Sequence, residues 1–129
     1  MSDRDILRAM VIEDEPSICI LCKRVMAGLG YTVDVVRNGV EAERKVEEYT
    51  YDLIVCDIRL PEVSGIDFYI WLQQEHHATS KKVIFMTGSV MDGDTGNFLS
   101  KSGRPYITKP FRPDDLLNII NTFNHTGGE

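Results

Sequence analysis

Polar side chains that could support phosphoryl chemistry follow four short apolar runs of this sequence: Glu13, Asp14, Asp57, Thr87 and Lys109. Carboxylates gathered in one crevice repel one another unless a cation joins them, and hard oxygen ligands suit Mg²⁺. A hydroxyl donor and an ammonium group beside that ion are what an incoming phosphoryl group requires. In such an arrangement Asp57 would be the nucleophile and would form an aspartyl-phosphate.

Asp57 stands directly after residues 53–56, an apolar run without polar alternation. Such a run suits a strand that is covered on both faces, as at the centre of a parallel sheet. Open α/β sheets gather their chemistry outside the carboxyl ends of these strands. Pro61 and Gly65 punctuate the loop that follows. The simpler alternative is that Asp57 only caps or turns the chain where the strand ends.

The elements that must position these residues can be placed by apolar periodicity. Short apolar or β-branched runs predict further strands at residues 8–12, 31–36, 83–86 and 106–108. Helical spacing predicts helices at residues 17–29, 40–49, 66–74, 92–102 and 113–123. Five strands thus alternate with five helices through short connections. The pattern predicts an α/β fold with a doubly wound, flavodoxin-like, five-stranded parallel sheet in a three-layer sandwich.

Three local expectations accompany this assignment. The second helix should turn Ala42, Val46 and Tyr49 inward. The polar stretch at residues 75–80, with its adjacent histidines, should be an exposed loop, because neighbouring side chains on a loop rarely converge on one metal ion. The helix at residues 92–102 contains two glycines, so its helix propensity is poor and it should be mobile.

Cys19 and Cys22 form a C-x-x-C pattern that invites a redox function. The alternative is that Cys22 belongs to the apolar stripe of its helix, with Cys19 flanking it; the stripe comprises Ile18, Leu21, Cys22, Val25 and Leu29. Cys56 belongs to the buried strand, and three cysteines cannot complete a disulfide framework.

Length and charge limit the classes of function that remain. The 129 residues predict a single domain at 1–129, with a core of about 6–124 and a polar tail at 125–129. A net charge of −6 argues against direct binding to nucleic acid or to anionic membranes. No stretch predicts a signal peptide or membrane insertion, so we expect a cytoplasmic protein.

The chain combines five features: an acidic pair after the first strand, an aspartate after the third, Thr after the fourth, Lys-Pro after the fifth, and a loop with Pro61 and Gly65. In this combination it resembles the response-regulator receiver domain of two-component phosphorelays. The resemblance covers roughly residues 6–123. It implies that Asp57 is the phosphoacceptor and that Asp14 is a direct Mg²⁺ ligand. It also implies that Glu13, where Asp is common, helps to hold the ion through water, and that the main-chain carbonyl of Arg59 completes the ligands.

The same resemblance assigns further roles. Thr87 and Tyr106 match the family's switch pair, and the peptide bond before Pro110 is expected to be cis. Each of these residues has a plainer alternative: Thr87 as a β-branched strand residue, Tyr106 as a half-buried strand aromatic, Lys109 as a surface lysine. Gly88 should leave access for water, while the side chains of Arg59 and Ser89 should tune the lifetime of the acyl-phosphate.

The expected partners are a histidine kinase or histidine phosphotransfer domain as donor and an output domain or protein downstream. Alone, the domain would not be an enzyme. The chain could also be a receiver cut from a hybrid histidine kinase, or a receiver-like interaction domain without the chemistry. A phosphatase with an aspartyl nucleophile would need a second Asp at the position of Arg59. In a flavodoxin-like module, the acidic run at 13–15 would repel the phosphate of the bound cofactor.

Overall fold

The computed structural model describes residues 6–88 and 93–125. Its strands are β1 (Arg8–Ile12), β2 (Thr32–Val36), β3 (Leu53–Asp57), β4 (Val83–Thr87) and β5 (Tyr106–Thr108). Its helices are α1 (Pro16–Gly28), α2 (Gly39–Glu48), α3 (Gly65–Glu75), α4 (His77–Ser80), α5 (Gly93–Ser102) and α6 (Pro113–His125). The strands form one parallel sheet in the order β2-β1-β3-β4-β5, which confirms the predicted fold.

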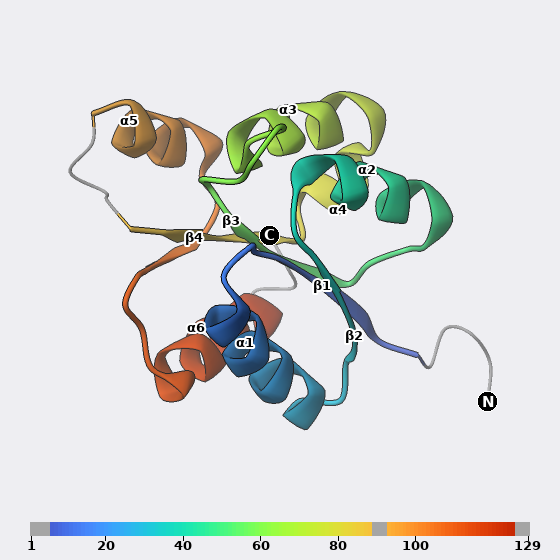
Figure 1. Ribbon diagram of the computed structural model, residues 1–129, viewed down its shortest axis with the longest axis vertical. Coiled ribbons are helices and arrows are strands. Elements are labelled where there is room, and N and C mark those ends of the chain that lie inside the picture. The colour runs from blue at the N-terminus through green and yellow to red at the C-terminus, as the bar shows by residue number, and fades with distance from the viewer. Residues whose placement is uncertain (1–5, 89–92, 126–129) are drawn as a thin grey trace.

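Helices cover both faces of this sheet in three layers. Helices α1 and α6 lie on one face, and α2, α3 and α5 lie on the other (Figure 1). The strand order reverses between β1 and β3, because the chain passes from β1 to β2 on one side and from β3 to β4 on the other. At such a switch point the loops that leave the two strands separate and open a crevice.

The alternation of side chains along the central strands builds a separate core on each face. Met10 and Ile12 of β1 enter the cluster beneath α2, α3 and α5. Ala9 and Val11 enter the cluster beneath α1 and α6. Every residue of β3 and β4 is buried, as an apolar run without alternation predicts for a strand covered on both sides.

The sheet register fixes where the polar strand ends meet. Ile12 pairs with Cys56, so the residues that follow β1 leave the sheet beside Asp57. Asp57 in turn pairs with Met86, the neighbour of Thr87. Thr87 pairs with Thr108, the residue before Lys109. The carboxyl ends of the strands therefore bring together the candidate residues Glu13, Asp14, Asp57, Thr87 and Lys109.

Residues that favour helix starts stand at the beginnings of α1, α2 and α3. The side chain of Asn38 accepts a hydrogen bond from the Glu41 N–H at the start of α2, and that of Ser64 accepts one from the Asp67 N–H at the start of α3. These N-caps satisfy backbone donors that the first turn leaves unpaired. Pro16 begins α1, where a missing N–H costs nothing.

The prediction that Tyr49 turns inward is wrong. Helix α2 ends at Glu48, and Tyr49 has extended backbone angles and is 39% exposed. Its ring lies beneath the guanidinium of Arg8, 4.2 Å from the ring centroid, so a cation–π contact holds it at the surface. Ala42 and Val46 are buried as predicted.

The stretch at residues 75–80 is not the exposed loop that was predicted. His77–Ser80 forms the short helix α4, in which Ser80 is buried and its hydroxyl donates to the His77 carbonyl at 2.6 Å. His76 packs on the Trp71 ring at 5.1 Å and lies 3.3 Å from a Glu47 carboxylate oxygen. His77 is exposed, as predicted, and among the described residues neither histidine belongs to a candidate metal cluster.

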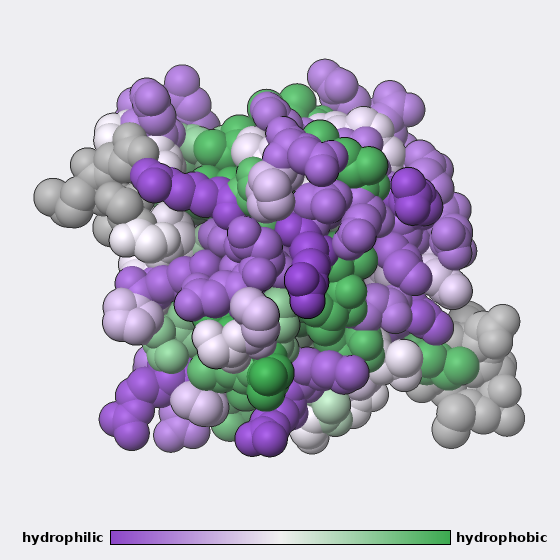
Figure 2. All heavy atoms as spheres, in the orientation of Figure 1, coloured by the Kyte–Doolittle hydropathy of each residue, from purple (hydrophilic) through white to green (hydrophobic). Residues whose placement is uncertain are grey.

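The surface mixes polar and apolar side chains. Figure 2 shows apolar residues gathered over α1 and α6 on the face it displays. On α1, Ile20 is 57% exposed, more than any other large apolar side chain in the described part of the chain. Within the described ranges, no helix has the length and apolar character needed to cross a bilayer.

Candidate functional site

Three carboxylates converge at the edge of the sheet where β1 and β3 end. One carboxylate oxygen from each of Glu13, Asp14 and Asp57 lies within 4.8 Å of the others. Glu13 is fully buried and Asp57 is 6% exposed, whereas Asp14 is open to solvent. The sequence-predicted acidic cluster is therefore assembled as the strand register requires, with one member facing outward.

Lys109 reaches into this cluster from the loop after β5. Its Nζ lies 2.6 Å from Oε1 of Glu13 and 3.2 Å from Oδ2 of Asp57. The Lys109 N–H donates to the Thr87 carbonyl at 2.8 Å, which ties the start of this loop to the end of β4. The Lys109–Pro110 peptide bond is cis, as the resemblance implied.

Burial and charge act in opposite directions on these groups. Burial raises the pKa of Glu13, and the nearby charge of Asp57 raises it further, while the hydrogen bond from Lys109 lowers it. Burial alone would lower the pKa of Lys109. The hydrogen bond to Glu13 and the charge of Asp57 outweigh this effect, so the pKa of Lys109 is raised and its ammonium form is favoured.

Backbone donors hold two of the carboxylates in place. The N–H of Glu15 donates to Oε2 of Glu13 at 3.1 Å, and the N–H of Arg59 donates to Oδ1 of Asp57 at 3.3 Å. Both donors lie two residues after their acceptor, so each carboxylate is held by the loop that it opens. The orientation of the side chains is therefore set locally as well as by the sheet.

Gly65 has a role that sequence reasoning missed, since it was interpreted only as loop punctuation. Its N–H donates to the Ile58 carbonyl at 2.9 Å, and a Cβ at this position would lie 2.2 Å from the Asp57 carbonyl oxygen. The start of α3 thus lies directly against the backbone that carries Asp57. Only a residue without a Cβ permits this approach. Local sequence gives no signal for a contact that depends on the tertiary fold.

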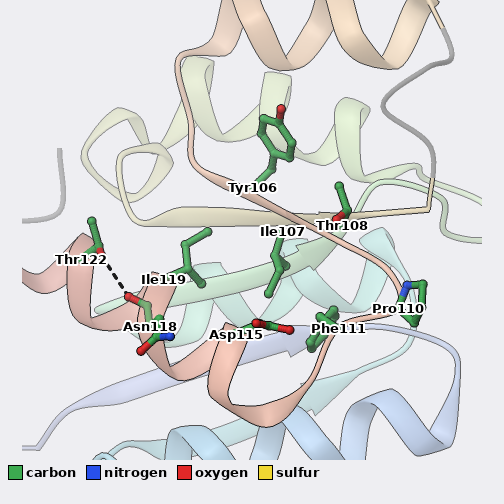
Figure 3. Close-up of a pocket in the computed structure, with 9 residues that line it drawn as sticks. All are labelled: Tyr106, Ile107, Thr108, Pro110, Phe111, Asp115, Asn118, Ile119 and Thr122. Carbon is green, nitrogen blue, oxygen red and sulfur yellow. Dashed lines mark hydrogen bonds between the residues drawn. The ribbon is translucent and has the colours of Figure 1, made fainter.

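Thr87 and Tyr106, the predicted switch pair, lie on the neighbouring strands β4 and β5. Thr87 ends β4 beside the pocket and is buried. Tyr106 lies two residues before Thr108 on β5 and is 43% exposed. Figure 3 shows Tyr106 and Ile107 on opposite sides of β5, with Ile107 on the α6 side. The movement of this pair stays a prediction.

The residues expected to tune the phosphoryl lifetime are only partly described. Arg59 is exposed in the loop after β3. A Cβ at Gly88 would meet nothing within 4 Å, so the space beside the end of β4 is open, in keeping with the expected access for water. Ser89 lies outside the described residues. The carbonyl of Arg59 as a metal ligand stays a prediction.

The structure does not favour a redox function for the C-x-x-C pattern. Cys19, Cys22 and Cys56 are free thiols. Cys22 is fully buried, and burial raises its pKa to about 12. Burial also raises the pKa of Cys19, whose Sγ donates to the Glu13 carbonyl at 3.2 Å. A raised pKa depletes the reactive thiolate, so Cys22 is best understood as part of the apolar stripe.

The chemistry of the donor set fits one divalent ion. With all four groups ionised, three carboxylates and one ammonium leave a net charge of −2 in the pocket. Carboxylate oxygens are the ligands that Mg²⁺ prefers, and Mg²⁺ sites use one or two of them together with water. Exposed Asp14 offers such an ion a route from solvent, with Asp57 next to it.

Comparisons with known proteins agree with this geometry. The family model described as response regulator receiver domain matches residues 9–121. The chain therefore belongs to the response-regulator receiver family. Among curated relatives, the polar-differentiation response regulator DivK of Brucella anthropi is 32% identical over 114 residues, which cover 88% of this chain and 93% of DivK.

Other relatives are longer proteins. The transcriptional regulatory protein TcrA of Mycobacterium tuberculosis is 31% identical over 121 residues, covering 94% of this chain but 47% of TcrA. The chain thus spans about half the length of several curated relatives that it matches.

Solved receiver structures show the same fold. The receiver domain of the sensor histidine kinase PA1611 from Pseudomonas aeruginosa, with a magnesium ion in its active-site cleft, has a TM-score of 0.78 at 28% identity and covers 91% of this chain and 96% of that one. A receiver domain protein from Methanospirillum hungatei has a TM-score of 0.79 at 25% identity, covering 91% and 92%.

Proposed function

We propose that this chain is a phosphoacceptor receiver domain of a two-component signalling system, and that it takes a phosphoryl group onto Asp57 in a Mg²⁺-dependent reaction. The observation that carries the proposal is the convergence of Asp57, two further carboxylates and Lys109 at the switch point of the sheet. Membership of the receiver family supports it. So does the magnesium ion in the cleft of the PA1611 receiver domain.

Asp14 and Asp57 would hold the ion directly, together with the main-chain carbonyl of Arg59. Glu13 would add its negative charge beside them. Bound Mg²⁺ would neutralise charge on the phosphoryl oxygens during transfer. The excess negative charge of the acidic pocket would attract the cation to a position close to Asp57.

The donor would be a phosphohistidine on a histidine kinase or a histidine phosphotransfer domain. A carboxylate oxygen of Asp57 forms the new bond to phosphorus while the bond between phosphorus and the imidazole nitrogen breaks. The imidazole leaves with that electron pair and is neutralised by a proton. Lys109, already 3.2 Å from Asp57, would pair with one phosphoryl oxygen, and the Thr87 hydroxyl would donate to another.

Phosphorylation would then change the surface that a partner meets. Thr87 moves toward the phosphoryl group, and Tyr106, now 43% exposed, turns into the space that is released. The surface of α5 and β5 changes with it. This is a shift between two packings that the modification biases, and an output domain or protein would recognise the second one.

The wider context of the domain is also a proposal. Because the chain spans about half of several relatives, it could act as a stand-alone regulator or within a longer protein such as a transcription regulator or hybrid histidine kinase. In either setting we assign it as the phosphoacceptor, not as the kinase that supplies the group. Its own residues would assist both the transfer and the later hydrolysis.

The test uses acetyl phosphate as a small phosphodonor with Mg²⁺, and intact-mass spectrometry detects the added phosphoryl group. The wild-type chain is expected to gain one group, and Asp57→Asn is expected to gain none. Asp67→Asn, an equivalent change at an exposed position of α3, is the matched control and should be modified normally. Labelling of Asp57→Asn would overturn the assignment. Failure of the wild type to take up phosphate or to bind Mg²⁺ would favour an interaction domain without the chemistry.

A further inference from the structure

Arg104 is a charged side chain buried between the end of α5 and the start of β5, with only 8% of its surface exposed. Its Nε donates a hydrogen bond to the carbonyl of Val83, the first residue of β4, at 3.0 Å. Its guanidinium carbon lies 6.0 Å from the centroid of the Phe123 ring, at the outer range of a cation–π contact. Phe123 belongs to α6, on the opposite face of the sheet from α5 (Figure 1). One side chain thus contacts both the sheet and a helix of the other layer.

The burial of this guanidinium is costly. Among the described residues, Nη2 of Arg104 is the one buried side-chain nitrogen or oxygen without a hydrogen-bond partner. A buried donor without a partner loses its bonds to water and gains nothing in exchange. Burial also lowers the pKa of Arg104, although a guanidinium stays charged at neutral pH. An apolar residue would fill the same space without these costs, so the hydrogen bond to β4 is what the arginine adds.

The last turn of α5 is continuous with this contact. Gly103 has a positive φ of 67°, and its N–H donates to the carbonyl of Leu99 at 3.3 Å. A left-handed residue at this place ends a helix and redirects the chain. The Ser102 hydroxyl donates to the same carbonyl at 3.0 Å and accepts from the N–H of Arg104 at 3.1 Å. The end of the helix and the backbone of Arg104 therefore form one hydrogen-bonded unit.

The two halves of α5 differ in their packing. The larger apolar contacts lie in the second half, where Leu99 is buried and the Phe98 ring packs on two aromatic rings of the core. The first half contains both glycines of the helix, and its buried side chain is the small Thr95. At Gly93, the first residue, an added Cβ would meet nothing within 4 Å. The helix is therefore packed more tightly at the end that Arg104 holds.

We propose that Arg104 is the anchor of α5: it fixes the C-terminal end of the helix to the start of β4, so that the helix pivots there and changes place at its N-terminal end. The pivot rests on the proposed function, in which Thr87 shifts and the surface of α5 changes. Val83 and Thr87 are the two ends of β4, about 13 Å apart at 3.3 Å per residue. The displacement thus begins at one end of this strand, and the anchor is at the other.

The first experiment tests the anchor by native-state hydrogen exchange of the unphosphorylated chain. Arg104→Met keeps an unbranched apolar chain and places a methyl group where Nε stands, so the hydrogen bond to β4 is lost. The amides of residues 97–102 should then exchange at least about tenfold faster than in the wild type. The Phe85 N–H, which donates to the backbone just before β5, should keep its protection. Arg44→Met, on the exposed face of α2, is the matched control and should exchange like the wild type.

Two results would overturn the anchor. Unchanged exchange of residues 97–102 in Arg104→Met would show that the arginine only fills space. Equal acceleration at Phe85 and in α3 would show general destabilisation and not the release of one helix end. If Arg104→Met does not fold, Arg104→Lys keeps the charge but places a methylene at the Nε position, and the same measurements are read in the same way.

The second experiment tests the pivot by NMR, with Mg²⁺ and excess acetyl phosphate to hold the chain in its phosphorylated form. In the wild type, the amide shifts of residues 93–97 should change more than those of residues 98–102. In Arg104→Met the two halves should change to a similar extent. Similar changes of both halves in the wild type would overturn the pivot. Failure of the wild type to be phosphorylated would refute the proposed function and the pivot with it, while hydrogen exchange would still decide the anchor.

Discussion

A single ammonium serves two carboxylates in the pocket, and this sharing explains why Glu13 and Asp57 can lie so close together. Lys109 Nζ is within 3.2 Å of both, and it reduces a repulsion that burial would otherwise strengthen. Asp14 adds a third negative charge, and no cation of the described residues forms an ion pair with it. At the scale of single residues, the pocket therefore holds more negative than positive charge, with one ammonium among three carboxylates.

Gly65 offers the sharpest test at this scale. Gly65→Ala should destabilise the fold by about 2 kcal/mol or more, because its Cβ would lie 2.2 Å from the Asp57 carbonyl oxygen and 2.9 Å from Ile58 Cα, and both are backbone atoms that cannot swing away. Denaturant unfolding measures the change. Phosphorylation of the folded fraction should also slow, since relieving the clash shifts the backbone of the nucleophile.

Gly28→Ala is the matched control for this change. Gly28 is the last residue of α1, and a Cβ there would meet nothing within 4 Å. The substitution should leave stability unchanged or raise it by up to about 1 kcal/mol, because alanine has the better helix propensity. Equal effects of the two substitutions would show that the close approach at Gly65 does not constrain the fold.

Among the five helices that the sequence predicts, α5 has the weakest support from its own residues. It contains Gly93 and Gly96, and its buried side chains are Thr95 and Leu99, while partly buried Phe98 packs against Tyr69 and Phe85. Helix α3, by contrast, buries Phe68, Tyr69 and Leu72. The two helices flank the same core on the same face of the sheet.

Native-state hydrogen exchange should separate these two helices. We expect the amides of residues 97–102 in α5 to exchange at least about tenfold faster than those of residues 69–75 in α3, because fewer apolar contacts oppose local opening. Ala substitution of exposed Gly93, where a Cβ meets nothing, should slow exchange in α5 alone. Equal protection in both helices would contradict the expectation of a mobile α5.

Most elements could be predicted because each has a local cause. The burial of β3 follows from its apolar run, and the start of α1 follows from Pro16. The position of Tyr49 was predicted wrongly because it depends on a contact with Arg8 of β1, which is distant in the sequence. Helix α4 was missed because its four residues lack apolar periodicity, and because the residue before it, His76, is placed by a tertiary contact with Trp71. Met26, fully buried on α1, was likewise left out of the predicted stripe.

The candidate site could be predicted to the level of residue types but not of contacts. Strand ends that meet at one edge are a consequence of parallel topology, so the acidic cluster and Lys109 followed from the sequence. The unequal distances of Lys109 to its two partners, and the approach of Gly65 to Asp57, depend on tertiary packing. No spacing in the chain encodes either of them.

For the molecule as a whole, we expect Mg²⁺ to raise the free energy of unfolding, since an ion that binds only the native pocket stabilises it by mass action. At a free concentration ten times the dissociation constant, the gain should be about 1.4 kcal/mol. Thermal or denaturant unfolding with and without Mg²⁺ measures it. Asp14→Asn should remove most of the gain, while Asp67→Asn, away from the pocket, should retain it.

The complete burial of β3 and β4 between two helical layers limits how this molecule can change shape. Displacing either strand would open both cores at once, so the centre of the sheet is its stiffest part. If Asp57 is phosphorylated as proposed, we expect the structural change to spread outward, through the loops beyond the strand ends and into α5. The rigid centre of the sheet would then leave these loops and α5 as the parts that move.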